Sequence, residues 1–211
     1  MLDLSKLTVE DAKLVQHGLK VLGFYDGTTR GFPGPKTQAA YDRHLASFET
    51  AASPEGESIS DALVRILRKE VGIVEHPKNS NRGKRVEEYQ TATWLDGSGW
   101  PWCAAFICWG LREVGKEIDL PFARPETAAA YGFENWAKDE GLKLYKPRST
   151  IRKGDIVMFK FSHIGLAVED ESNGYVVMVE GNTDVSGSRD GGGVYKKRRA
   201  TSLIRSHIRI S

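Results

Sequence analysis

The residues most suited to chemistry begin with a cysteine, Cys103, which follows a Trp-Pro-Trp segment at 100–102 and opens an apolar run with helical spacing. Pro101 does not fit the interior of a helix, but it fits at or just before the first turn. We therefore expect Cys103 in that first turn, where free backbone N–H groups and the helix dipole favour an anion such as the nucleophilic thiolate. The pattern fits a small buried cysteine equally well, so this segment alone does not decide between a nucleophile and a core residue.

A second cysteine, Cys108, lies five residues further on, between Ile107 and Trp109 in the interior of the same expected helix. We interpret it as a core residue. Five residues apart on a helix, the two side chains face different directions, so we expect no disulfide between them. Both cysteines should therefore be reduced, as a reactive thiol requires.

A nucleophilic cysteine needs a base, and the base needs a partner that orients it. His163 opens an expected strand, and the Asn-Gly pair at 173–174 is typical of a hairpin turn that leads into the strand 175–182. The start of one hairpin strand lies beside the end of the next, which brings Glu180 and Asn182 near His163. These two residues are two apart and should share a face. The sequence thus predicts a Cys, a His and an orienting Glu or Asn.

Four short motifs around these residues resemble, in order, those of the CHAP domain (cysteine, histidine-dependent amidohydrolase/peptidase). They are Pro-Trp-Cys-Ala-Ala-Phe, Gly-Asp-Ile-Val, Ser-His-Ile-Gly and Val-Glu-Gly-Asn-Thr. The resemblance covers roughly residues 60–211 and implies a papain-like fold that cuts bacterial peptidoglycan. It implies that Cys103 is the nucleophile, His163 the base, Glu180 the acid that orients it and Asn182 the fourth polar residue.

The expected reaction is attack of the Cys103 thiolate on an amide carbonyl, with His163 carrying the proton. The backbone N–H of Cys103 and a second donor would stabilise the oxyanion. Tyr89 and Trp102 are the two candidates for contact with the substrate there, and the sequence does not separate them. No metal and no organic cofactor is expected, because Asp96 alone offers too few oxygens for a calcium loop.

The first part of the chain resembles a small helical peptidoglycan-binding domain over about residues 5–48. A helix ends in Leu-Gly-Phe, a Tyr-Asp-Gly turn follows, and Gly-Pro-Lys-Thr-Gln-Ala-Ala opens the next helix. The chain departs from that pattern in the loop 28–33. The other interpretation is a helical hairpin that only packs on the catalytic domain.

The fold that we expect is α+β, a papain-like domain with helices packed on an antiparallel sheet, preceded by a small all-α domain. The boundaries are 1–48 for the helical domain, 49–58 for a linker and 59–211 for the catalytic domain. The basic run 196–199 either attracts anionic glycan or, more simply, forms a solvated strand face.

Composition and net charge limit the classes of partner that we expect. The 211 residues carry a formal net charge of only +2, which gives no reason to expect nucleic acid, and no apolar run is long enough for a membrane span. The first residues lack the apolar core of a signal peptide. We therefore expect synthesis in the cytoplasm, followed by holin release, as for an endolysin, or by delivery as a secreted antibacterial effector with an immunity protein.

The expected partner is bacterial peptidoglycan, and the expected state is a monomer. Two other functions remain open at this point: a catalytically inactive cell-wall binding protein, and a cysteine peptidase that acts on protein. The sequence does not say which amide is cut, so N-acetylmuramoyl-L-alanine amidase and endopeptidase activity both remain possible.

Overall fold

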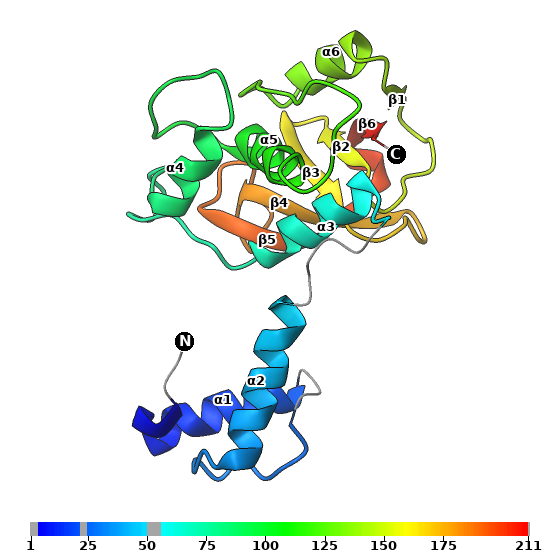
Figure 1. The fold of residues 1–211 in the computed structure, drawn as a ribbon. Helices are drawn as coiled ribbons and strands as arrows, with labels where there is room; N and C mark the ends of the chain where they lie inside the picture. Colours follow the sequence, from blue (N-terminus) through cyan, green and yellow to red (C-terminus); the bar gives the residue numbers. More distant parts are fainter. Residues whose placement is uncertain (1–3, 22–24, 50–55, 211) are drawn as a thin grey trace. The chain divides into compact units, whose positions relative to one another are not determined.

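The computed structural model describes residues 4–21, 25–49 and 56–210. The chain divides into two compact units, Met1–Glu55 and Gly56–Ser211 (Figure 1). In the part of the chain that is described, no helix is long and apolar enough to cross a membrane.

The first unit contains a short 3-10 helix, η1 (Leu4–Lys6), and two α-helices, α1 (Val9–Val21) and α2 (Pro35–Glu49). Thr8 accepts a hydrogen bond from the backbone N–H of Asp11 at the start of α1. Gln16 is buried between the helices, and its amide donates to the carbonyl of Phe32 and to the Thr37 hydroxyl while accepting from the N–H of Gly31. The loop that departs from the binding-domain pattern is therefore fixed by one glutamine of α1.

The expected linker, 49–58, begins inside α2 and ends at the cap of the next helix. Ser58 caps α3 by accepting from the N–H of Asp61, and Glu57 pairs with Arg65 of α3. Residues 50–55 lie outside the described residues.

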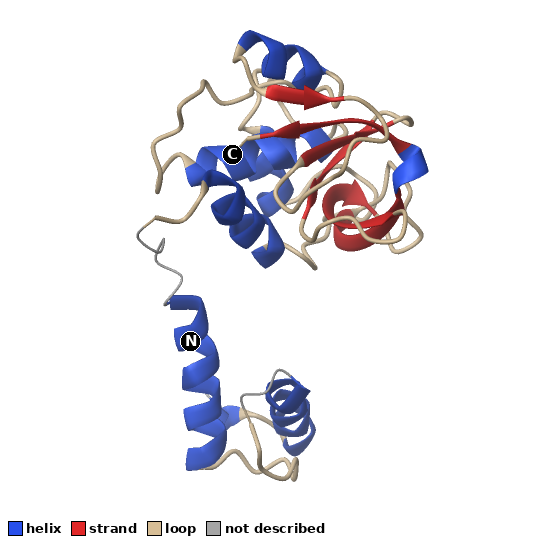
Figure 2. Cartoon of the chain, turned by 90° about the vertical axis from the view of Figure 1, so that its right-hand side faces the viewer, coloured by secondary structure: helices blue, strands red, loops and turns tan. Residues whose placement is uncertain are grey.

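The second unit is α+β, as the sequence predicts. Its helices are α3 (Ile59–Lys69), α4 (Lys84–Gln90), α5 (Cys103–Val114) and α6 (Gly132–Asp139), with a short η2 (Thr201–Leu203). Its strands are β1 (Lys143–Tyr145), β2 (Ile156–Phe159), β3 (His163–Ala167), β4 (Tyr175–Thr183), β5 (Gly193–Ala200) and β6 (Ile204–Arg209). All neighbouring strands are antiparallel, in the order β1-β6-β2-β3-β4-β5, and Figure 2 shows them in red beside the helices in blue.

Helix α5 is the centre of this unit. It packs against β3 and β4 on one side and against α3 and α4 on the other, while α6 covers β1 and β6. Because α5 is enclosed in this way, nearly all its side chains are apolar and buried. Its close approach to β4 depends on Gly181, where an added Cβ would lie 2.7 Å from the Trp102 ring and 2.9 Å from Phe106. The first turn of α5 is thereby held against the end of β4.

Candidate active site

Cys103 is the first residue of α5, as its position behind Pro101 predicts. The residue before it, Trp102, is the N-cap, and its carbonyl accepts from the N–H of Phe106. The N–H groups that precede Phe106 in the first turn have no acceptor within the helix, so they face a group beyond its end. The Cys103 side chain is buried, with 8% of the residue exposed.

His163 and Glu180, the expected base and its partner, form a hydrogen-bonded pair. His163 opens β3, Glu180 lies in β4, both are fully buried, and His163 Nε2 lies 3.0 Å from Glu180 Oε2. Gly165 makes room for this pair, because a Cβ there would lie 2.6 Å from Glu180 Cγ. A residue with any side chain at position 165 would displace the carboxylate from the imidazole.

The Cys103 thiol lies beside His163 and acts on its charge. Burial lowers the pKa of His163, but the Cys103 sulfur and the Glu180 carboxylate more than offset this and raise the pKa to about 9. Nε2 of the ring is occupied by Glu180, whereas Nδ1 has no hydrogen-bond partner among the described residues. Nδ1 is therefore the ring nitrogen that is free to exchange a proton with a thiol.

Cys108 has a different environment. It is fully buried inside α5, and its thiol lies 3.5 Å from the carbonyl of Thr127, to which it donates. Burial raises the pKa of the Cys108 thiol strongly, which keeps it protonated and unreactive. Both cysteines are free.

Asn182 lies near the end of β4, but its side chain is engaged elsewhere. Its Nδ2 donates to the carbonyl of Arg189, and its Oδ1 has no partner within the described residues. The backbone of Asn182 has φ +57°, and the pairing of β4 with β5 shifts register between Glu180 and Thr183. This irregularity breaks the two-residue alternation, so the expectation that Glu180 and Asn182 share a face does not apply here. The imidazole partner is Glu180.

Comparison with known proteins identifies the domain. Residues 95–182 match the family model described as the CHAP domain. This stretch is a CHAP domain. No curated protein matches the chain.

Among solved structures, the chain is similar to one described as the crystal structure of a wild type endolysin LysIME-EF1, with 17% sequence identity and a TM-score of 0.44. The likeness covers 71% of this chain and 63% of that chain.

An arginine just beyond the matched residues completes the buried cluster. Arg199 of β5 donates through Nε to Glu180 Oε1 at 2.8 Å and through Nη2 to Glu180 Oε2 at 2.6 Å. Its guanidinium also lies over the rings of Phe159 and Phe161. Burial raises the pKa of Glu180, but Arg199 and His163 more than offset this, so the carboxyl stays ionised with a lowered pKa.

Arg199 was not among the expected site residues, because the run 196–199 reads in the sequence as one basic, solvated strand face. The structure corrects this: Lys196 and Arg198 are exposed, while Arg199 is buried on the opposite side of the strand. Strand alternation within the run was the signal that separates them.

Tyr89 and Trp102 do not fit the expected role of substrate contacts through their polar atoms. Both are fully buried in the CHAP-containing unit; the Tyr89 hydroxyl donates to Glu70, and the Trp102 indole N–H donates to Glu75. Their rings stack with centroids 5.4 Å apart, and Tyr89 packs edge-on against Phe106. Both rings pack against Phe106 in the first turn of α5, the turn that carries Cys103.

Among the described residues, no group of three or more His, Cys, Asp or Glu side chains is arranged to hold a metal ion.

Because the pKa of His163 is raised to about 9 from its ordinary 6.5, the buried cluster stabilises the fold fully below pH 6.5, and this stabilisation is lost as the pH rises through about 9. We expect the free energy of unfolding of the wild type to fall over that range. In the Glu180→Gln variant the free energy of unfolding should fall less over the same pH range, because a neutral amide stabilises an imidazolium less well than a carboxylate does. Urea unfolding followed by tryptophan fluorescence measures this, with exposed Glu169→Gln as the control. Equal pH dependence in wild type and Glu180→Gln would contradict the assignment.

Removing Arg199 leaves the buried Glu180 carboxylate without its bidentate partner. We expect Arg199→Met to lower the free energy of unfolding by about 3 kcal/mol at pH 7, as for other broken buried ion pairs. The adjacent Arg198→Met is a matched control, since Arg198 is exposed and stacks over Tyr175. The same urea titration measures both, and an equally small loss in the two variants would show that Arg199 does not hold Glu180.

Proposed function

We propose that this chain is a peptidoglycan hydrolase that cleaves an amide bond of the cell-wall stem peptide with Cys103 as nucleophile. Two findings support the proposal: the CHAP domain match over residues 95–182, and the meeting of Cys103, His163 and Glu180 in one buried cluster. The second finding carries the chemistry, because the hairpin of β3 and β4 brings Glu180 to His163, whereas Cys103 reaches them from a separate element, α5.

The raised pKa of His163 favours transfer of the thiol proton to its Nδ1 before the substrate binds, and in the first half of the reaction the Cys103 sulfur attacks the amide carbonyl carbon. The negative oxygen of the tetrahedral intermediate faces the start of α5, where the N–H of Cys103 donates to it. The carbon–nitrogen bond then breaks, and the leaving amine takes the proton from His163. A thioester on Cys103 and a free amine result.

In the second half, water attacks the thioester carbonyl and gives its proton to His163. The carbon–sulfur bond breaks, the carboxylic acid leaves, and the Cys103 thiol is restored by the proton from His163. Glu180 stays ionised throughout, fixes the ring through Nε2 and stabilises its positive charge. Arg199 keeps Glu180 ionised and in place.

The first unit fits a supporting role in this function. On its resemblance to small peptidoglycan-binding domains, we propose that residues 1–48 hold the chain on the wall while the second unit carries out hydrolysis. Attachment through a second site raises the effective substrate concentration without changing the chemical barrier. The setting that we propose is a phage-type endolysin released through a holin, or an antibacterial effector delivered by a secretion system.

The central test is digestion of purified sacculi with mass spectrometry of the products. We expect Cys103→Ala to lose hydrolysis completely while it remains folded, and Cys108→Ala to stay active with a loss of stability of about 1 kcal/mol. The masses of the products tell an amidase from an endopeptidase. A folded Cys103→Ala protein that still cuts sacculi would refute the mechanism. Wild-type protein that leaves sacculi intact but digests casein would indicate a protein peptidase.

The role of the first unit is tested with a chain that begins at Gly56, which keeps the Ser58 cap and the Glu57–Arg65 pair. We expect it to cleave a soluble muropeptide at a rate within about twofold of the full chain and to be depleted less by insoluble sacculi, because only the wall-binding site is gone. Circular dichroism checks that it is folded. A folded truncated chain that sediments with sacculi as well as the full chain would assign the first unit to packing alone.

A further inference from the structure

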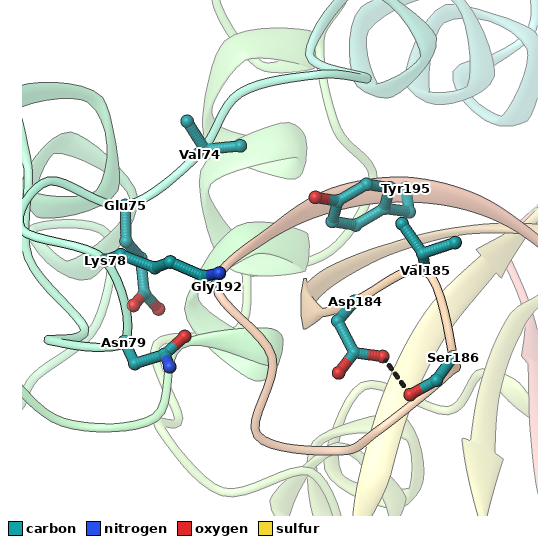
Figure 3. A pocket seen from close by; sticks show the side chains of 9 residues that line it. All are labelled: Val74, Glu75, Lys78, Asn79, Asp184, Val185, Ser186, Gly192 and Tyr195. Atoms are coloured by element: carbon teal, nitrogen blue, oxygen red, sulfur yellow. Dashed lines mark hydrogen bonds between the residues drawn. The ribbon is translucent and has the colours of Figure 1, made fainter.

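A pocket of 510 Å³ is lined by residues that the mechanism does not use (Figure 3). One wall is the segment after α3, with Glu75, Lys78 and Asn79. The other wall is the loop between β4 and β5 and the start of β5, with Asp184, Val185 and Tyr195.

Both walls of the pocket are linked to segments that carry the reactive groups. Glu75 Oε1 accepts from the indole N–H of Trp102, the residue that precedes Cys103, at 2.9 Å. The loop of the far wall begins directly after Thr183 at the end of β4, the strand that carries Glu180. One wall of the pocket is thus hydrogen-bonded to the residue before Cys103, and the other wall follows the strand that carries Glu180.

Glu75 leaves one carboxylate oxygen without a partner. The residue is 95% buried, since 5% of its surface is exposed, and its Oε2 has no hydrogen-bond partner within the described part of the chain. A buried charged acceptor is expected to be satisfied by a donor. This oxygen therefore indicates a ligand that brings one.

Gly192 leaves the space in front of this oxygen open. A Cβ built on Gly192 would lie 3.4 Å from Glu75 Oε2 and 3.4 Å from Asn79 Oδ1. Two acceptor oxygens thus lie near the same glycine, and because Gly192 has no side chain, a ligand can approach both of them. A group with several N–H donors and a positive charge, such as a primary ammonium, satisfies both oxygens at once.

The other side chains of the pocket indicate the rest of the ligand, the part that carries the ammonium. Val74, Val185 and the ring of Tyr195 offer apolar contact to an aliphatic chain, and Lys78 adds a cation that suits a carboxylate. The pocket chemistry therefore fits an aliphatic chain with one ammonium and one carboxylate, as in a diamino acid whose other amine is already in a peptide bond.

The far wall is already in place. Lys197 donates to the carbonyls of Asp184 and Val185, Arg199 donates to the carbonyl of Gly187, and the Thr183 hydroxyl donates to the carbonyl of Ser188. A preformed wall lowers the ordering cost of binding.

We propose that this pocket binds the side-chain ammonium of the diamino acid in the peptidoglycan stem peptide, with Glu75 and Asn79 as its acceptors, and so selects which stem is presented to Cys103. The assignment of the ligand rests on the proposed function. The pocket is a specificity site, and none of its residues takes part in the chemical step.

The test is a binding measurement by ¹H–¹⁵N NMR on the full chain carrying Cys103→Ala, which prevents turnover. The probes are a stem tripeptide that ends in lysine, L-Ala-γ-D-Glu-L-Lys, and the same peptide with its side-chain amine acetylated. We expect the free amine to bind at least tenfold more tightly than the acetylated peptide and to shift the amide signals of Asn79 and Gly192.

Two further substitutions test whether the preference for the free amine comes from this pocket. Glu75→Gln keeps an acceptor for the Trp102 indole but removes the charge, and it should abolish the preference for the free amine. Gly192→Ala places a methyl group in front of both oxygens at ordinary contact distance and should weaken the free amine at least fivefold. The exposed Glu169→Gln should change neither affinity.

Equal affinity for the two peptides, or a preference that survives Glu75→Gln and Gly192→Ala, would overturn the pocket assignment. Hydrolysis of sacculi by the wild type separates this result from the proposed function. If sacculi are cut but the amine preference is absent, the pocket assignment fails alone. If the preference is present but sacculi stay intact, the pocket assignment stands and the proposed function fails.

Discussion

A buried chain of charges that runs from β5 through β4 and β3 to the first residue of α5 is the constraint on which the rest of the structure depends. Arg199 binds Glu180, Glu180 binds His163, and His163 lies beside Cys103. Each charge is costly to bury alone, because it loses hydration, and each is tolerated because its neighbour compensates it. The arrangement raises the pKa of His163 although burial opposes this, which suits a base that must hold a proton next to a thiolate.

Close packing keeps these groups in register. Gly181 lets Trp102 and Phe106 approach β4, and Gly165 lets the Glu180 side chain lie across β3. Tyr89 supports Trp102 from α4, and its hydroxyl is fixed by Glu70. Tyr89 and Trp102, which the sequence suggests for substrate contact, thus pack at the start of α5, the helix that carries Cys103. The same support leaves Glu75 with one satisfied and one free oxygen, which links the packing of α5 to the neighbouring pocket.

Local sequence patterns predict much of the fold and of the candidate site, but not all of it. Pro101 and the apolar run after it place Cys103 at a helix start, and the turn at 173–174 brings Glu180 back to His163. The side-chain direction of Asn182 was missed because a shift in register breaks the alternation there. Two other features depend on tertiary contacts: β1 is a three-residue edge strand, and the role of Arg199 is visible only once β5 pairs with β4.

The charge state of His163 tests the account most directly. ¹⁵N NMR of the labelled imidazole, recorded from pH 5 to 10 on the full chain and on Cys103→Ala, reports the protonation of each ring nitrogen. We expect wild-type His163 to be an imidazolium at pH 7, with both nitrogens protonated and a titration near pH 9, and to titrate at a lower pH once the Cys103 sulfur is removed. A neutral imidazole at pH 7 in the wild type, or a titration that does not change in Cys103→Ala, would contradict the central claim.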